Sequence, residues 1–168
     1  LATGSFDRWL LAKTDNIHFL AVYAVALSAA APMYILLDVG NKVYSPFVFE
    51  RLRDGERNFS KFWHLVAGFN AFSMLAALVG GVLGFFFVRQ FFGLEYQAAA
   101  LLCGPLCFAI GAFSLYYSAS PFLYYFNETK LILLASVIGA ITTGLVSTTT
   151  FPVLDGGGLI LGKLLGFL

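Results

Sequence analysis

Long runs without a charged residue are the feature that most limits what this chain can fold into. From Ile17 to Leu37 there is no Asp, Glu, Lys or Arg, and a second such run extends from Phe62 to Val88. A helix of about 20 apolar residues crosses the roughly 30 Å hydrocarbon layer of a membrane. The composition agrees, because 60% of the 168 residues are hydrophobic and 11% are charged, too few polar residues for the surface of a soluble domain. The sequence therefore predicts an integral membrane protein.

The predicted fold class is all-α, a polytopic transmembrane helical bundle. Only helices and closed barrels satisfy their own backbone hydrogen bonds in lipid, and the alternation of a barrel strand is absent from the sequence. We expect the end of a helix over 1–8 and helices over 17–42, 62–88, 97–126, 131–154 and 156–168. The 97–126 run contains Pro105 and Pro121 and is too long for one upright span. We expect it to form one tilted, bent helix rather than two.

The charged residues predict an orientation. Four of the ten basic residues fall in one short connection, namely Arg51, Arg53, Arg57 and Lys61. Short loops rich in Lys and Arg stay on the cytoplasmic side, so this connection is expected to be cytoplasmic. A basic stripe across a folded surface, which nucleic-acid binding requires, does not occur, and no nucleic-acid partner is expected.

Small residues predict close helix packing. Gly80, Gly81 and Gly84 place a small face on the second apolar run, the pattern that lets membrane helices approach closely. Cys103 and Cys107 lie four residues apart without a histidine or carboxylate nearby in sequence. They are interpreted as small packing residues rather than metal ligands, and no metal or cofactor is expected.

One polar stripe is the main functional candidate. On a helix, Tyr34, Asp38, Lys42 and Ser45 share a face, which continues through Tyr23, Leu27 and Ala30. A charged side chain at the centre of a membrane helix costs about 2.5 to 3.5 kcal/mol on insertion scales, so such a stripe is not expected to face lipid. Two interpretations stay open. The charges either line a watery cavity, or form an interfacial pair where the helix has nearly crossed the hydrocarbon layer.

Hydroxyl-bearing residues recur on two later runs. The third run carries Ser114, Tyr117, Ser118, Pro121 and Tyr125, and the fourth carries Ser136, Thr143, Ser147 and Thr150. Hydroxyls on helices often bond to their own backbone, so these residues either serve helix packing or line a wetted internal surface.

Motifs of common enzymes are missing. The sequence has no placeable Ser-His-Asp order, no phosphate-binding glycine loop after a strand, and no paired carboxylates of the hydrolase kind. We therefore expect no enzyme on the basis of its motifs. A polytopic membrane enzyme acting on lipid-linked glycans and a structural membrane subunit stay open as alternative interpretations.

Several short motifs carry a resemblance to a known family. They are Phe6-Asp7-Arg8-Trp9-Leu10-Leu11, Val22-Tyr23-Ala24-Val25-Ala26, Phe49-Glu50-Arg51-Leu52 after Pro46, Asp54-Gly55-Glu56, Phe92-Gly93-Leu94-Glu95-Tyr96 and Asp155-Gly156-Gly157-Gly158. In this pattern nearly the whole chain resembles polysaccharide and O-antigen flippases of the Wzx type, which belong to the multidrug/oligosaccharidyl-lipid/polysaccharide exporter superfamily.

The resemblance implies a function and a setting. It implies the C-terminal lobe of a two-lobe exporter that flips an undecaprenyl-diphosphate-linked oligosaccharide by alternating access, for polysaccharide or lipopolysaccharide synthesis. The location implied is the bacterial inner membrane, with membrane lipids and the N-terminal lobe of the same chain as partners and a proton or sodium gradient as driving force. The absent initiator Met and the apolar end at Leu168 likewise lead us to expect a fragment.

A cationic cavity would suit the diphosphate of such a substrate. The candidate substrate-binding residues are Arg8, Tyr34, Asp38 and Lys42. Arg8 matches a motif of the family, whereas the other three are assigned from their helical spacing alone.

Overall fold

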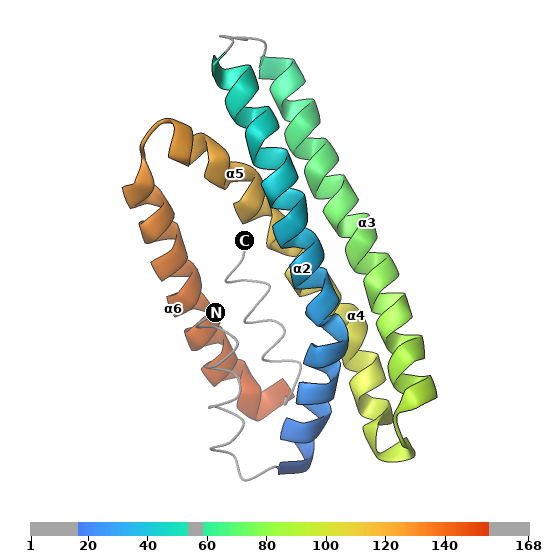
Figure 1. Cartoon of the computed structure of the whole chain (residues 1–168). Coiled ribbons are helices and arrows are strands. Elements are labelled where there is room, and N and C mark those ends of the chain that lie inside the picture. Colours follow the sequence, from blue (N-terminus) through green and yellow to red (C-terminus); the bar gives the residue numbers. More distant parts are fainter. Residues whose placement is uncertain (1–16, 54–58, 155–168) are drawn as a thin grey trace.

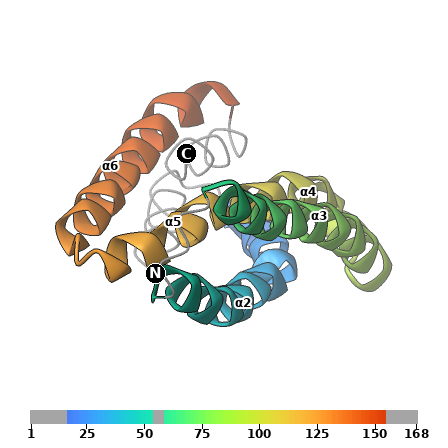
Figure 2. The same cartoon turned by 90° about the horizontal axis from the view of Figure 1, so that it is seen from above.

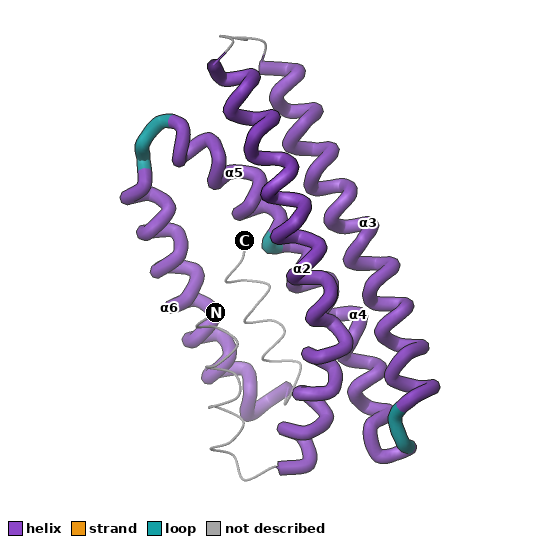
Figure 3. Tube along the Cα trace, in the orientation of Figure 1, coloured by secondary structure: helices purple, strands orange, loops and turns teal. Residues whose placement is uncertain are grey.

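The computed structural model describes residues 17–53 and 59–154, and these ranges are helical apart from short turns between the helices (Figure 1). The elements are α2 (Ile17–Arg53), α3 (Phe59–Phe91), the short 3-10 helix η1 (Leu94–Tyr96), α4 (Gln97–Ala112), α5 (Ser114–Tyr125) and α6 (Thr129–Leu154). The described residues contain no strand (Figure 3). The all-α fold class is confirmed. The helices expected over 1–8 and 156–168 lie outside the described residues.

Three helical segments are long and apolar enough to cross a membrane. They are His18–Arg53, Trp63–Phe91 and Leu94–Tyr125. The apolar part of α6 found in the described residues, Thr129–Thr143, is shorter. The chain is thus a multi-pass membrane helical bundle, as its charge-free runs predicted.

Helix α2 is longer than its apolar run. We expected it to end near Lys42, but it continues for 37 residues to Arg53. Lack of charge marks the part of a helix that lipid tolerates, whereas a helix ends where its backbone is interrupted, and Pro46 does not interrupt this one. Arg51 and Arg53 occupy the last turn, where positive charge stabilises the carboxyl end of the helix dipole.

The third apolar run is divided where no proline stands. We expected one bent helix over 97–126, but α4 ends at Ala112 and α5 begins at Ser114. Between them the Phe113 N–H donates to the Ile110 carbonyl, three residues back, at 3.1 Å, and the Tyr117 N–H donates to the Phe113 carbonyl at 3.2 Å. The break is therefore one tightened turn. Pro105 and Pro121 both lie inside helices.

Asn127 turns the chain from α5 into α6. It has a φ of 61°, in the left-handed region that Asn tolerates better than most residues. The Glu128 N–H donates to the Leu123 carbonyl at 2.9 Å, and the Asn127 N–H donates to the Tyr124 carbonyl at 3.1 Å. These bonds cap the carboxyl end of α5 in the manner of a Schellman turn.

The helices form a packed group with an arm. α3 and α4 share the most extensive contact, and α2 packs against both. Figure 2, viewed along this group, shows α5 leading away from it and α6 lying beyond α5. α5 also contacts α2 and α3, while α6 packs against α5, where the Tyr116 and Ser136 hydroxyls are 3.4 Å apart.

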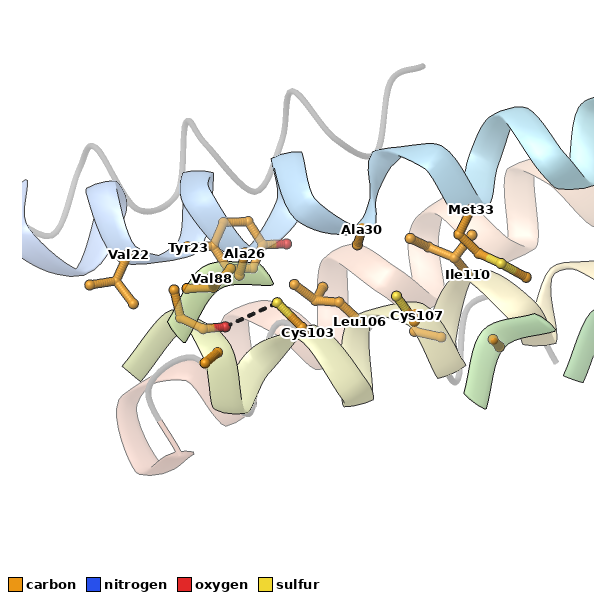
Figure 4. Close-up of a cluster of buried hydrophobic side chains, with 14 of the residues drawn as sticks. Val22, Tyr23, Ala26, Ala30, Met33, Val88, Cys103, Leu106, Cys107 and Ile110 are labelled. Atoms are coloured by element: carbon orange, nitrogen blue, oxygen red, sulfur yellow. Dashed lines mark hydrogen bonds between the residues drawn. The ribbon is translucent and has the colours of Figure 1, made fainter. Parts of the chain in front are cut away.

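The core lies between α2 and α4. Figure 4 shows Tyr23, Ala26 and Ala30 of α2 facing Cys103 and other side chains of α4. These residues are buried, together with Val22, Met33, Leu37, Leu106, Cys107 and Ile110. Both helices contribute small residues to this core, which allows their backbones to approach closely.

Glycines bring α3 against α4, as the small-residue pattern predicted. A Cβ atom at Gly81 would lie 3.0 Å from the Gly104 Cα, and one at Gly84 would lie 3.2 Å from the Cys103 Cβ. About two turns further along α4, a Cβ at Gly111 would lie 2.7 Å from the Ala77 Cβ. Cys103 and Cys107 are free thiols buried in this contact, which confirms that they act as small packing residues.

Candidate functional site

The predicted polar stripe contains a formed ion pair. The Lys42 Nζ lies 2.7 Å from the Asp38 Oδ2, and both belong to α2, one helical turn apart. The Lys42 and Asp38 side chains are 71% and 53% exposed. An exposed pair of this kind contributes little to stability, so stability does not account for two charges in this helix.

The depth of the pair follows from the neighbouring helix. The Phe69 ring stacks on Tyr44 with centroids 4.6 Å apart, and a Cβ at Gly40 would lie 3.4 Å from the same ring. Lys42 stands between these two positions and is therefore level with Phe69 of α3. Asp38 is one turn further from the Arg53 end of α2.

The pair lies within the apolar layer of α3. The charge-free run from Phe62 to Val88 is roughly 40 Å long at 1.5 Å per residue. A 30 Å hydrocarbon layer centred on that run begins roughly 5 Å from each of its ends. Phe69 lies roughly 10 Å along the run, and the level of Asp38 is about one 5.4 Å turn deeper. This position favours the cavity interpretation over the interfacial one, because charges at this depth are unfavourable against lipid.

A tyrosine of α5 belongs to the same surroundings. Tyr117, half-buried, lies close enough to the Asp38 carboxylate and the Lys42 ammonium for their charges to affect its ionisation. The charged flank of α2 is therefore the flank turned toward α5. Tyr117 was predicted as part of a separate stripe, and the contact between α2 and α5 brings the two stripes together.

The other predicted residues divide into three groups. Arg8 lies outside the described residues. Tyr34 is 37% exposed, and the Ser45 hydroxyl donates to the Asn41 Oδ1 at 3.2 Å, further along α2. Tyr23 and Ala30, which we expected to continue the polar face, are buried in the core. The stripe thus passes from the core to the surface toward the C-terminal end of α2.

Buried polar contacts that the sequence did not predict join α2, α3 and α5. The Tyr44 hydroxyl donates to the Ser118 carbonyl at 3.3 Å. The Ser114 hydroxyl donates to the Asn70 Oδ1 at 2.8 Å, and the Asn70 Nδ2 donates to the Val66 carbonyl at 2.9 Å. Asn70 is the lone amide in a charge-free run of 27 residues, which was an available signal. Together, Tyr44, Asn70, Ser114 and Ser118 form the polar contact between these helices.

Most hydroxyls of the two later stripes serve helix packing. Ser114 and Ser118 are buried. The Ser118, Ser136 and Thr143 hydroxyls each donate to a backbone carbonyl of their own helix at 2.8 Å. The side chains of Ser147 and Thr150 lie outside the described ones. Tyr125 is exposed, at the α6 end of α5.

Other chemistry is not assembled in the described part of the chain. Residues 17–53 and 59–154 contain no group of three or more His, Cys, Asp or Glu side chains that could hold a metal ion. A scan against protein-family models, a search of curated proteins and a search of solved structures found no match for the chain.

Proposed function

We propose that the chain is part of a membrane transporter for an anionic, lipid-linked substrate, and that the flank of α2 bearing Asp38 and Lys42 lines the path of that substrate. The observation that carries the proposal is the exposed Lys42–Asp38 pair at a depth where α3 is uncharged. Charged side chains inside a membrane protein usually face a water-filled cavity or a partner. A transport path meets that need.

The substrate class follows from the cation and from the resemblance of the sequence to Wzx-type flippases. Lys42 would attract a diphosphate, which lipid cannot solvate, and Asp38 would hold the ammonium in place between transport events. The Tyr117 hydroxyl, on the facing helix, can donate to a phosphate oxygen. We therefore propose an undecaprenyl-diphosphate-linked oligosaccharide as substrate and flipping across the bacterial inner membrane as the activity.

Translocation tests the role of Lys42. The full-length protein is reconstituted in vesicles, and transfer of a fluorescent lipid-linked oligosaccharide between leaflets is measured for wild type, Lys42→Gln and Lys130→Gln. Lys130 is an exposed lysine in the first turn of α6, so its variant controls for loss of one positive charge. We expect Lys42→Gln to slow transfer at least tenfold and Lys130→Gln to leave it unchanged. Equal transfer by Lys42→Gln and wild type, at equal insertion, contradicts the proposal.

Water access tests the path independently of the substrate. In a background without Cys103 and Cys107, single cysteines replace Tyr34 and Leu36, which lie at similar depth on opposite sides of α2 and are 37% and 39% exposed. Leu36 lines an apolar groove with Phe72 and Leu75 of α3. We expect a polar maleimide to label Tyr34→Cys and to spare Leu36→Cys. Protection of both positions would instead indicate a subunit whose polar flank is covered by protein.

A further inference from the structure

An apolar groove runs along the outer surface where α3 meets α4. Its volume is about 690 Å³. The side chains around it come from one flank of each helix: Ala77, Leu78, Gly81, Val82, Phe85 and Phe86 of α3, and Ala100, Leu101, Gly104, Pro105 and Phe108 of α4. All of them are apolar, and the groove lies within two segments that are long and apolar enough to cross a membrane.

The groove exists because glycines replace side chains on its floor. Gly81 and Gly104 bring the two backbones into contact, since a Cβ at Gly81 would lie 3.0 Å from the Gly104 Cα. The Gly104 Cα itself faces open space, because a Cβ built there meets no atom within 4 Å. Leu78, Val82 and Leu101 form the rims and are each more than half exposed. The hollow is therefore open from the side, toward the hydrocarbon of the membrane.

One end of the groove carries a positive charge. Arg89 follows Leu78, Val82 and Phe85 at intervals of four, three and four residues, so it lies on the same stripe of α3. Its guanidinium Cζ is 6.0 Å from the centre of the Phe85 ring, which lines the groove. Within residues 17–53 and 59–154 Arg89 forms no ion pair. Glu95, in η1, is the nearest acidic residue along the chain.

The length of the groove matches one leaflet. From Leu78 to Arg89 there are eleven residues, or roughly 16 Å of helix. Half of a 30 Å hydrocarbon layer is about 15 Å. An acyl chain lying in the groove would therefore place its headgroup at the level of Arg89, roughly 5 Å beyond the hydrocarbon layer and within the headgroup region. A phosphate is the group that an arginine at that position binds best, through parallel N–H···O bonds.

We propose that the groove between α3 and α4 binds one acyl chain of an anionic phospholipid whose phosphate contacts Arg89. The lipid is a structural ligand of the lobe and is separate from any transported substrate, because the groove opens on α3 and α4, whereas Asp38 and Lys42 lie on α2. Basic side chains at the membrane surface select anionic lipids by charge. The proposal does not depend on the transport function.

Photolabelling of the reconstituted full-length protein tests the site. The vesicles consist of phosphatidylcholine and contain a small, equal fraction of either phosphatidylglycerol or phosphatidylcholine with a photoreactive group on one acyl chain. After irradiation, lipid adducts on peptides of α3 and α4 are measured by mass spectrometry. We expect adducts on Leu101 and Phe108, with about fivefold more from phosphatidylglycerol, the factor of one basic residue near an anionic surface.

Three variants separate charge from shape. Arg89→Gln keeps the groove, and we expect it to bring the ratio of the two labels close to one. Gly104→Leu fills the hollow, and we expect it to reduce labelling by both lipids about fivefold. Gly68→Leu is the matched control, because a Cβ at Gly68 also meets no atom within 4 Å and Gly68 lies on α3 away from the groove; its labelling should equal that of wild type.

Two outcomes would overturn the proposal. Equal labelling of the wild type by the two lipids would remove the role of Arg89. Absence of acyl adducts from the wild-type groove would mean that another protein helix covers it, and disulfide formation between copies carrying Leu101→Cys would identify that helix as part of a second copy. Thermal unfolding, followed by circular dichroism, checks that Gly104→Leu folds. If Gly104→Leu does not fold, Arg89→Gln still tests the effect of the charge.

Discussion

The contact between α3 and α4 differs in chemistry from the contact between α2 and α5. Glycines and two buried thiols bring α3 and α4 together. The α2–α5 contact contains the hydrogen bond from Tyr44 to Ser118, with a charged pair beside it. A close apolar contact has one good geometry, because any shift opens a void or a clash. Polar groups can exchange one partner for another or for water. We therefore expect α3 and α4 to move as one body and α2 and α5 to separate more easily.

The largest expected effect comes from adding volume to the α3–α4 contact. Gly111→Val would place its Cβ 2.7 Å from the Ala77 Cβ, which cannot rotate away. We expect a loss of about 3 kcal/mol in the free energy of unfolding, measured by titration with a denaturing detergent. Gly68→Val, in open space on α3, is the control and should stay close to wild type. Similar losses for both variants would show that helix propensity rather than close packing sets the effect.

Removal of the amide in the polar contact is expected to cost less. Asn70→Leu deprives the buried Ser114 hydroxyl of its acceptor at 2.8 Å, and we expect a loss of about 1 kcal/mol in the free energy of unfolding. Ser114→Ala in that background should add almost nothing, because the shared bond is already gone. Additive losses in the double variant would mean that the two side chains act independently.

A smaller effect is expected for the Tyr44 hydroxyl. Tyr44→Phe removes the 3.3 Å bond to the Ser118 carbonyl and keeps the ring stacked on Phe69. The expected loss in stability is about 0.5 kcal/mol. The more informative measurement is the distance between spin labels on α2 and α5. It should broaden in Tyr44→Phe if this bond limits their separation, and an unchanged distribution would assign that role to packing alone.

The smallest expected effect on stability is that of Lys42→Gln. Its ion pair with Asp38 is exposed, and exposed pairs contribute little. We expect an unfolding transition that coincides with that of wild type, in contrast to the at least tenfold slower transfer expected under the proposed function. A large destabilisation would assign the pair a structural role and would weaken the comparison between the two contacts.

The sequence predicted the α3–α4 contact better than the α2–α5 contact. Gly80, Gly81 and Gly84 predict close packing, because a residue without a side chain lets a neighbouring helix approach closely whichever residues that helix presents. The pairing of Tyr44 with Ser118 joins residues 74 positions apart, and no local pattern in the sequence selects one hydroxyl among many. Spacing along one helix predicted the Asp38–Lys42 pair, but the proximity of Tyr117 needed the packing of α5.

The helix boundaries that differed share a physical cause. Charge-free runs mark the residues that lipid accepts, and α2 continues beyond its run to Arg53 because nothing in its backbone stops it. The division at Phe113 was not predicted, because the expected bends were placed at Pro105 and Pro121, yet proline inside a helix removes one hydrogen bond and need not end it. At Phe113 the tightened turn instead adjoins Gly111, where α4 lies hard against Ala77 of α3.

Because α2 is one long helix, a tilt at the polar pair would move its two ends by different distances. Lys42 lies eleven residues from Arg53 and twenty-five from Ile17, or roughly 16 Å and 37 Å along the same helix. A tilt of about 10° pivoting at Lys42 would move the Arg53 end by roughly 3 Å and the Ile17 end by roughly 6 Å. The Ile17 end would thus move about twice as far as the Arg53 end, so that a tilt set at the depth of Lys42 would displace the more distant end of α2 most.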